Sequence, residues 1–531
     1  MKNNLEKILW LKHNELKGDM DADEFRNYYF GLIFYKYLSE KIEFELNNFL
    51  KDKRINFDNA YENEEYKKEL EDYSVKKLGY FIQPKHLFNQ IIKKIKNKYY
   101  LFDGLDKENN IIDDLNKALK EIENSSKDQE SENDFINIFR DINSKSENSD
   151  KNKLISKVLL YLSEIDFNLT TNEETNKNTD IECSLRETTL GDIFEYLISQ
   201  FALNIGKLND FHTPKQVSKL LAKLATVNKK NIKTVYDPCC GSASLLLRVG
   251  KEAYISDFYG QELDMANYNL ARMNMIVNNV SYDNFDIQQG NVLENPKYLD
   301  KKFELIVSNP PFSIKWSADK SFLDDVRFKE YGKLAPKSKA DFAFIQDMIY
   351  HLDDNGTMVA IVPYGVLFRG ANEGIIRKYL IKEKNSLDAV IGLPNNIFNG
   401  TSIYTVVLVF RKNRENKNNI LFIDASKNFE KIKNKSILTD EFINKIINTY
   451  NKRDEIEDYS HIASLNEIKE NDYNLNISRY INNFKEEELD EKEIINKIKD
   501  ANNEIKGIDK KVEEYCIQLN IKKPFFIDMD K

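Results

Sequence analysis

The stretch VYDPCCGSAS (residues 235–244) decides the fold of the second half of this chain. A short β-type run ends in an acid, passes through a tight turn of small residues and opens an apolar helix. Units of strand, turn and helix build doubly wound sheets, whose ligands bind at the carboxyl ends of the strands. Asp237 suits a cationic amino-acid group better than a pyrophosphate, and Gly241 lets the backbone approach a ligand closely. On its own, the stretch is equally consistent with an ordinary strand-to-helix turn.

Similar runs follow along the chain beyond about residue 185. Seven β-rich runs alternate with helical stretches, which predicts an open α/β sheet of seven strands. No convincing helix joins the last two runs, so we expect the final strand to lie antiparallel beside its predecessor. The predicted strands are residues 234–236, 258–260, 285–287, 305–307, 358–362, 389–391 and 405–410.

The ends of the second and third strands extend the predicted ligand site. Glu262 lies 262 − 237 = 25 residues beyond Asp237, close to where an acid of such sheets accepts hydrogen bonds from ribose hydroxyls. Asn291 follows the third strand, where its amide can read the edge of an adenine. Partners for an amino acid, a ribose and a purine at three strand ends predict S-adenosylmethionine (AdoMet) as the ligand.

The stretch LIVSNPPF (residues 305–312) carries the sharpest signal. Two prolines fix the backbone after a buried strand, so the side-chain oxygen of Asn309 and the carbonyl of Pro310 can accept hydrogen bonds from an exocyclic amine. Phe312 offers a stacking face to a base flipped out of the duplex. We therefore predict Asn309, Pro310, Pro311 and Phe312 as the catalytic residues; the alternative is a Pro-Pro turn with a chance asparagine.

The segment DFHTP (residues 210–214) precedes the sheet and completes a recognisable order of motifs. With DPCCGSAS and NPPF after it, the chain resembles the modification subunits of type I restriction-modification systems, which are adenine-N6 DNA methyltransferases. The resemblance covers nearly the whole chain. It includes MDADEFRN (20–27), YGKLAPKSKADFAF (331–344), NIFNGTS (396–402) and NDYNLNI (471–477).

The resemblance implies transfer of a methyl group from AdoMet to N6 of adenine in double-stranded DNA, with residues 210–214 closing over AdoMet. It also implies a specificity subunit that carries the DNA recognition site, a restriction and translocation subunit, and two copies of this chain in the complex. The residues expected to bind AdoMet are Asp210, Phe211, His212, Thr213, Pro214, Asp237, Gly241, Ser242, Ala243, Ser244, Glu262 and Asn291.

Three positions depart from the pattern of the family, which has Tyr, Gly and Asp where this chain has His212, Ala243 and Asn291. His212 keeps a planar ring but loses the phenol. Asn291 can still hydrogen-bond adenine, although its oxygen accepts less strongly than a carboxylate. Ala243 adds a methyl group that is tolerated unless the backbone there has a positive φ. Together the departures predict weaker AdoMet binding, and an architectural subunit with a decayed cofactor site stays an alternative.

The rest of the chain predicts two further parts beside a methyltransferase domain at residues 183–480. Residues 1–169 read as a helical domain, in which residues 25–38 form a buried helix capped by Asp21 or Asp23. A short helix is expected at 135–142, another at 154–162, and a domain boundary in the polar stretch 170–179.

The tail, residues 481–531, carries an apolar residue at alternating intervals of four and three. This pattern predicts a coiled-coil helix that seeks a partner helix, and the resemblance implies that the specificity subunit supplies it. The alternative is a tail folded back on its own domain. The seam comprises Ile494, Ile498, Ala501, Ile505, Ile508, Val512, Tyr515 and Leu519.

Composition narrows the classes of protein that the 531 residues can form. The net charge of −9 argues against a chain that grips DNA unaided. Four cysteines without CxxC, and five histidines without HExxH, argue against disulfides and metal and favour the cytoplasm. No apolar run is long enough for a membrane span, and no GxxxxGK[ST] motif supports a translocase on this chain.

Two alternatives stay open at this stage. NPPF also suits the amide of a protein glutamine, so a protein methyltransferase is a rival, although the DFHTP segment and the helical N-terminal region speak against it. Basic residues near the predicted site can contact phosphates or form ordinary solvated surface, which we favour. These residues are Lys315, Lys333, Lys337, Lys339 and Arg369.

Overall fold

The structure is a computed structural model. It describes residues 10, 21–101, 111–140, 142, 149–165, 190–205, 213–398, 401–432, 435–481, 491–519 and 521. The chain forms two compact units, Met1–Ile481 and Asn482–Lys531. None of the helices among these residues is long and apolar enough to cross a membrane.

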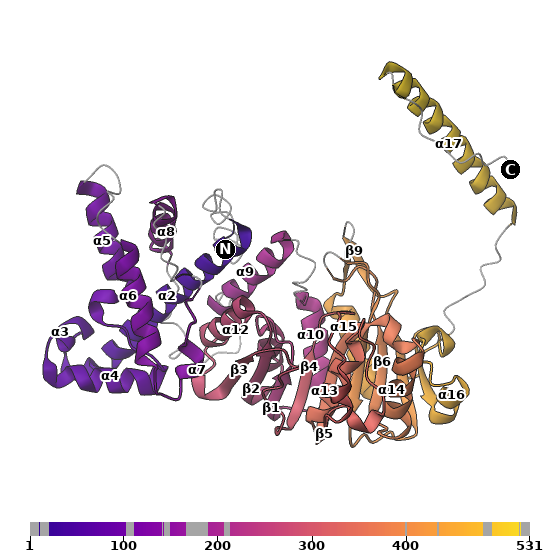
Figure 1. Cartoon of the computed structure of the whole chain (residues 1–531), viewed down its shortest axis with the longest axis horizontal. Helices are drawn as coiled ribbons and strands as arrows, with labels where there is room; N and C mark the ends of the chain where they lie inside the picture. The colour runs from indigo at the N-terminus through magenta and orange to yellow at the C-terminus, as the bar shows by residue number, and fades with distance from the viewer. Residues whose placement is uncertain are drawn as a thin grey trace, which may run out of the picture. The chain divides into compact units, whose positions relative to one another are not determined.

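The first unit is built around a nine-stranded sheet with the order β11-β8-β6-β7-β5-β4-β1-β2-β3. In Figure 1 its strands β3, β2, β1 and β4 follow one another from the side of the N-terminal helices. All seven predicted strands are present as β1 to β7, and β7 lies antiparallel between β5 and β6, which confirms the expected reversal. Parallel pairing joins β1 to β2 and β4, β2 to β3, β4 to β5, and β6 to β8. The bounds are β1 (Asn231–Asp237), β2 (Tyr254–Glu262), β3 (Phe285–Gln289), β4 (Phe303–Ser308), β5 (Leu352–Pro363), β6 (Leu387–Gly392), β7 (Thr405–Arg411), β8 (Asn419–Asp424) and β11 (Ser460–Ser464).

The prediction of seven strands was too low, because β8 and β11 extend the sheet beyond β6. The stretch NILFID at β8 is a short apolar run with the same signature as the other strands. A separate two-stranded hairpin consists of β9 (Glu430–Ile432) and β10 (Lys435–Ile437). β11 is antiparallel to β8 and ends the sheet on that side.

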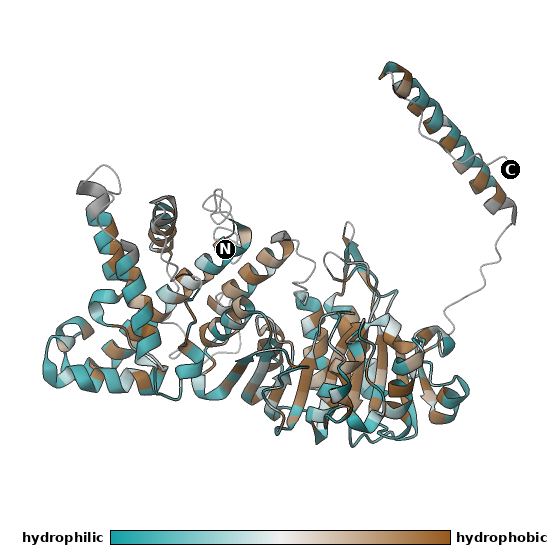
Figure 2. Ribbon diagram, in the orientation of Figure 1, coloured by the Kyte–Doolittle hydropathy of each residue, from teal (hydrophilic) through white to brown (hydrophobic). Residues whose placement is uncertain are grey.

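The strands are apolar on both faces, as expected for a sheet covered on both sides. Along β4, Leu305 and Val307 belong to one buried apolar cluster, whereas Phe303 and Ile306 belong to another. The first cluster includes residues of α10, α11, α12 and α15, and the second includes residues of α13 and α14. The brown strands between teal helix surfaces in Figure 2 show the same pattern. Helix bounds are α9 (Leu190–Ile205), α10 (Lys215–Ala225), α11 (Ser244–Gly250), α12 (Met265–Val277), α13 (Asp341–His351), α14 (Ala371–Lys382), α15 (Asp440–Lys452) and α16 (Leu465–Glu470).

The N-terminal region is helical, as predicted, and α2 (Ala22–Phe49) is its most buried helix. Asp21 caps α2 by accepting hydrogen bonds from the backbone N–H groups of Asp23 and Glu24. The helix predicted at 135–142 is wrong, because α7 ends at Phe135 and Asn137 has a φ of +54°, which ends a helix. The other helices are α3 (Phe57–Tyr61), α4 (Glu64–Leu78), α5 (Phe88–Leu101), α6 (Ile111–Ser125), α7 (Glu132–Phe135) and α8 (Ser149–Leu162).

The N-terminal helices pack against the sheet domain through α12, beside β3 (Figure 1). The fully buried Arg272 donates hydrogen bonds to the carbonyls of Asn133 and Ile136, at 2.8 and 3.0 Å. The hydroxyl of Tyr37 donates to the carbonyl of Ile276. The predicted boundary at 170–179 lies outside the described residues, so the division into domains 1–169 and 183–480 stays a prediction.

The second unit contains α17 (Glu491–Gln518), which is the predicted tail helix. Its apolar seam is largely exposed: Ile498, Ile508 and Tyr515 have exposed fractions of 55%, 55% and 61%. Brown residues follow one another along an otherwise teal helix (Figure 2). The side chain of Ile494 lies outside the described set.

Candidate active site

Asp237 ends β1 and is almost fully buried at the carboxyl edge of the sheet. Its Oδ1 accepts hydrogen bonds from the backbone N–H of Cys239 at 3.0 Å and from the hydroxyl of Ser308 at 2.7 Å. Burial raises the pKa of Asp237 to about 7, and the charge of Glu262 adds to the rise while the two hydrogen bonds offset part of it. A cation beside this carboxyl group would stabilise its charged form.

Glu262 ends β2 and holds the turn that follows β1. Its two carboxylate oxygens accept hydrogen bonds from the backbone N–H groups of Gly241 at 2.9 Å and Asp264 at 2.8 Å. Burial raises the pKa of Glu262 even though these N–H groups lower it. Gly241 has a φ of +53°, and a Cβ atom there would meet nothing within 4 Å. The turn therefore presents open backbone at this edge of the sheet.

Ala243 has a φ of +61° at the start of α11. This is the left-handed region, where the Cβ of an alanine meets the backbone and glycine is favoured. Because its φ is positive, Ala243 is costly at this position, where the family has glycine. The buried methyl group strains the turn that carries Gly241 and Ser242.

We expect Ala243→Gly to raise the free energy of unfolding by about 1 kcal/mol, because a glycine adopts the left-handed conformation without strain. The measurement is the urea midpoint at an unchanged slope of the transition. Ala222→Gly, at a buried position inside α10, is the matched control and should lower stability by a similar amount. A loss of stability in both variants would show that Ala243 carries no strain.

A polar network between α9 and α12 supports the same turn. Glu195 on α9 accepts hydrogen bonds from the hydroxyl of Ser244 at 2.9 Å and from the amide of Asn274 on α12. The amide Nδ2 of Asn274 also donates to the carbonyl of Ser242 at 2.8 Å. Burial raises the pKa of Glu195. Glu195 and Asn274 were missed in the sequence because no local pattern marks helix residues that contact a distant turn.

Asn309 follows β4, and its amide is joined to the segment before the sheet. Asn309 Nδ2 donates a hydrogen bond to the hydroxyl of Thr213 at 3.0 Å. Phe312 is buried and packs edge-on against Phe398, with ring centroids 5.3 Å apart and planes at 89°. The structure therefore brings Thr213, from the end of the DFHTP motif, together with Asn309 of NPPF. Phe398 was missed, although it lies inside the quoted segment NIFNGTS.

The loop after NPPF is anchored to the first turn of α13. Asp341 accepts hydrogen bonds from the backbone N–H of Ser313 at 2.7 Å and from its hydroxyl at 3.2 Å. Arg369 forms ion pairs with Asp341 at 2.6 Å and with Glu373 at 2.9 Å. Arg369 thus helps to hold this loop through its two ion pairs. It is neither the phosphate contact nor the solvated surface residue that the sequence suggested.

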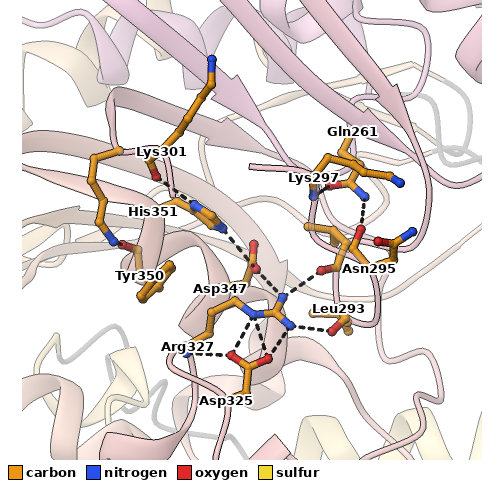
Figure 3. Close-up of polar contacts among 12 residues, drawn as sticks. Gln261, Leu293, Asn295, Lys297, Lys301, Asp325, Arg327, Asp347, Tyr350 and His351 are labelled. Atoms are coloured by element: carbon orange, nitrogen blue, oxygen red, sulfur yellow. Dashed lines mark hydrogen bonds and ion pairs between the residues drawn. The ribbon is translucent and has the colours of Figure 1, made fainter. Parts of the chain in front are cut away.

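The buried Arg327 links Asp347 of α13 to the turn after β3 (Figure 3). Its guanidinium donates to the carbonyls of Val292 and Leu293, both at 2.8 Å, and pairs with Asp347 and Asp325, also at 2.8 Å. Val292 and Leu293 directly follow Asn291. One helix therefore holds both the loop after NPPF and the turn after β3.

These elements surround a cleft with a volume of about 190 Å³. Of the predicted residues, it is lined by Thr213, Asp237, Gly241, Ser242, Ser244, Glu262, Asn309 and Pro311. Residues of α2 and α9 that were not predicted also line it: Arg26, Phe30, Ile198, Phe201 and Ala202. The N-terminal helices thus contribute a wall to the cleft.

Several predicted residues are placed elsewhere. Pro214, Ala243, Pro310 and Phe312 lie next to lining residues without lining the cleft themselves. Asn291 is not in the lining either, and its Oδ1 accepts a hydrogen bond from the backbone N–H of Leu293 at 3.0 Å. Its predicted contact with adenine stays a prediction. Asp210, Phe211 and His212 lie outside the described residues, so their predicted contacts with AdoMet stay predictions.

The chain is similar to known families over most of its length. The N-6 DNA Methylase family matches residues 186–489, and the HsdM N-terminal domain matches residues 5–162. The chain belongs to the N-6 DNA methylase family. It is a DNA methyltransferase that acts on N6 of adenine, and the rival assignment to protein glutamine is set aside.

Several proteins are similar to this methylase in sequence, and one of known structure is similar to it in fold as well. The type I restriction enzyme MpnII methylase subunit of Mycoplasma pneumoniae is 36% identical over 98% of each chain. The type I restriction enzyme HindI methylase subunit of Haemophilus influenzae is 32% identical, over 56% of this chain and 70% of that protein. A crystal structure of the type I restriction-modification system methyltransferase subunit from Streptococcus thermophilus is 37% identical, with a TM-score of 0.79 over 90% of this chain and 99% of that one. The predicted family and fold class are confirmed.

AdoMet is the methyl donor of this family, and the cleft of the methylase suits it. Two buried carboxyl groups with raised pKa values, Asp237 and Glu262, gain from a cationic ligand. Gly241 leaves open space beside them, and Phe201 and Leu270 give the cleft an apolar side. Among the residues that the structure describes, no group of three or more His, Cys, Asp or Glu side chains is placed to hold a metal ion.

Proposed function

We propose that this methylase binds AdoMet between the carboxyl ends of β1 and β2 and methylates a flipped adenine held at Asn309. The observation that supports this most strongly is a single cleft that is lined both by Asp237, Glu262 and Gly241 and by Asn309 and Pro311. A methyl donor and an acceptor amine placed there would be neighbours, and proximity is a large part of such catalysis.

The chemistry of the acceptor side rests on two oxygens. When bound, AdoMet supplies an electrophilic methyl group. The side-chain oxygen of Asn309 and the carbonyl of Pro310 accept hydrogen bonds from the N6 amine and turn its lone pair toward the cleft. The ring of Phe312, fixed by Phe398, stacks on the base.

The cofactor side rests on charge. The carboxylate of Asp237 pairs with the ammonium group of the methionine part of AdoMet. Glu262 accepts hydrogen bonds from the ribose hydroxyls with the lone pairs that Gly241 and Asp264 leave. Ser242, Ser244 and the segment 210–214, through groups other than the hydroxyl of Thr213, complete the binding site, as the resemblance implies.

We place the methylase in a complex with double-stranded DNA, a specificity subunit, a restriction and translocation subunit, and a second copy of this chain. Its relatives are named as subunits of type I restriction enzymes. The exposed seam of α17 supports a helical partner, and the net charge of −9 supports a partner that supplies much of the grip on DNA.

The test of the function is incorporation of a labelled methyl group from AdoMet into DNA by the purified complex, together with sequencing of methylated bases in cells with and without the gene. We expect one adenine in a fixed sequence to lose its methyl group when the gene is absent. Unchanged methylation in the deleted strain would refute the function.

We expect Asp237→Asn to weaken AdoMet binding by about 1–3 kcal/mol, because it removes a charged hydrogen bond. In the unaltered chain the affinity should rise as the pH increases through about 7, since the carboxyl group must lose its proton to pair with the ammonium. Asp237→Asn should abolish that dependence. Calorimetric titration from pH 6 to pH 8 measures both effects, and a chain that binds no AdoMet at all would support the decayed architectural subunit.

The same variant has an opposite effect on stability. The pKa of Asp237 rises on folding from 3.8 to about 7, so the folded chain binds the proton more tightly than the unfolded chain. Stability is therefore lost as the pH rises through this window, and the cost is fully present above it. At pH 8, Asp237→Asn should raise the free energy of unfolding by an amount on the order of 4 kcal/mol, because each unit of the rise in pKa corresponds to about 1.4 kcal/mol. Weaker binding with lower stability would point to simple damage instead.

A further inference from the structure

The hydrogen bond between Thr213 and Asn309 joins two segments that are 96 residues apart. Asn309 Nδ2 is the donor and the hydroxyl of Thr213 is the acceptor, at 3.0 Å. Both residues line the cleft. The contact is thus made where the target amine would be held, and it occupies the nitrogen end of the amide.

The position of the Thr213 hydroxyl is set by the start of α10. Pro214 caps this helix with a φ of −55°, and the hydroxyl of the buried Ser218 lies 3.5 and 3.4 Å from the carbonyls of Thr213 and Pro214. α10 packs against β4 and β5, the strands that carry and flank Asn309. The hydroxyl and the amide therefore sit on parts of one rigid framework.

The chemistry of the amide explains why this contact matters. An asparagine amide presents an NH₂ donor at one end and an oxygen acceptor at the other, and the two ends are related by a half turn. The N6 amine of adenine is a donor, so only the oxygen end can receive it. A threonine hydroxyl can bond either end of an amide. In the structure it accepts from Nδ2 of Asn309, and this orientation makes the oxygen the end that can accept the amine, whereas a rotated amide would set two NH₂ groups against each other.

We infer that Thr213 is a positioning residue for methyl transfer, because its hydroxyl holds the amide of Asn309 with the oxygen toward the target amine. This inference rests on the proposed role of Asn309. It differs from the contact with AdoMet that the resemblance implies for Thr213, since the hydroxyl acts through Asn309. It also gives the DFHTP segment a direct part in the acceptor side of the site.

The experiment uses the full-length chain in the purified methylase complex, with saturating AdoMet and a single-turnover assay of DNA methylation. We expect Thr213→Val, which keeps the shape and removes the hydroxyl, to lower the methylation rate about 10- to 100-fold. Its Kd for AdoMet, measured by calorimetry, should change by less than about threefold. Thr213→Ser should restore most of the rate because the hydroxyl returns.

A matched control is Thr226→Val at the other end of α10. Its hydroxyl donates to the carbonyl of Ala222 at 2.9 Å, away from the cleft. This variant should leave both the methylation rate and the affinity for AdoMet unchanged. A fall in rate equal to that of Thr213→Val would show that the effect is only a loss of α10 stability, and would overturn the inference.

A double-mutant cycle separates this inference from the proposed function. In a chain that already carries Asn309→Ala, Thr213→Val should not lower the residual methylation rate further, because Thr213 acts only through Asn309. A full additional loss would overturn the inference, as would an undiminished rate for Thr213→Val alone. An undiminished rate for Asn309→Ala would instead refute the proposed role of Asn309 itself.

Discussion

Asn309→Ala is expected to lower the methylation rate roughly 100- to 1,000-fold while AdoMet binding stays nearly intact. The amide oxygen is proposed to receive the N6 amine, and losing one such fixed partner of a reacting group has an effect of this size in other enzymes. Asn309 lines the cleft at the end of β4, whereas Asp237 and Glu262 lie at the ends of β1 and β2. The acceptor and cofactor parts of the site are therefore separable by mutation.

The measurement combines single-turnover methylation of DNA with calorimetric titration of AdoMet. Asn413→Ala is the matched control, because the exposed amide of Asn413 bonds Asn355 near the amino end of β5, at the opposite edge of the sheet. It should change neither quantity. An equal loss of AdoMet binding and of rate in Asn309→Ala would contradict the assignment of Asn309 to the target amine.

Truncation after Asp490 is expected to abolish assembly of the complex and, with it, methylation of specific sites. The truncated chain keeps the compact unit Met1–Ile481 and should still bind AdoMet. It loses α17, whose seam exposes Ile498, Ile505 and Ile508 by 47–55%. We expect a regular apolar seam of this kind to pack against a helix of a partner, so its loss should remove that contact.

Co-purification of a tagged chain with the full-length specificity subunit measures the effect. Within the full-length chain, Ile505→Asp should reduce the yield of the complex strongly, because it places a charge in the seam. Asn503→Asp adds the same charge to an exposed position outside the seam and is the matched control. An undiminished yield of the complex from the truncated chain would exclude α17 as the docking helix.

Much of the fold was predictable from the sequence because its signals are local. Strands such as β4 and β5 read as apolar runs since they are buried on both faces. The antiparallel β7 followed from the missing helix before it. The buried α2, with its cap at Asp21, and the helix α17 followed from helical periodicity. β8 had the same apolar signature as the other strands and was overlooked. The end of α7 at Phe135 and the positive φ of Asn137 have no local signal in the sequence.

The site was predictable only as far as its motifs reach along the chain. The order of DFHTP, DPCCGSAS and NPPF indicated which residues bind and react, because strand ends of parallel sheets meet at one edge. The positive φ of Ala243, the Thr213–Asn309 bond, the support of Ser244 by Glu195 and the anchoring of Ser313 by Asp341 came only from the tertiary structure. These contacts join residues that are far apart in sequence or depend on how a turn is closed. Their geometry arises from packing of the whole domain, which no local pattern of residues encodes.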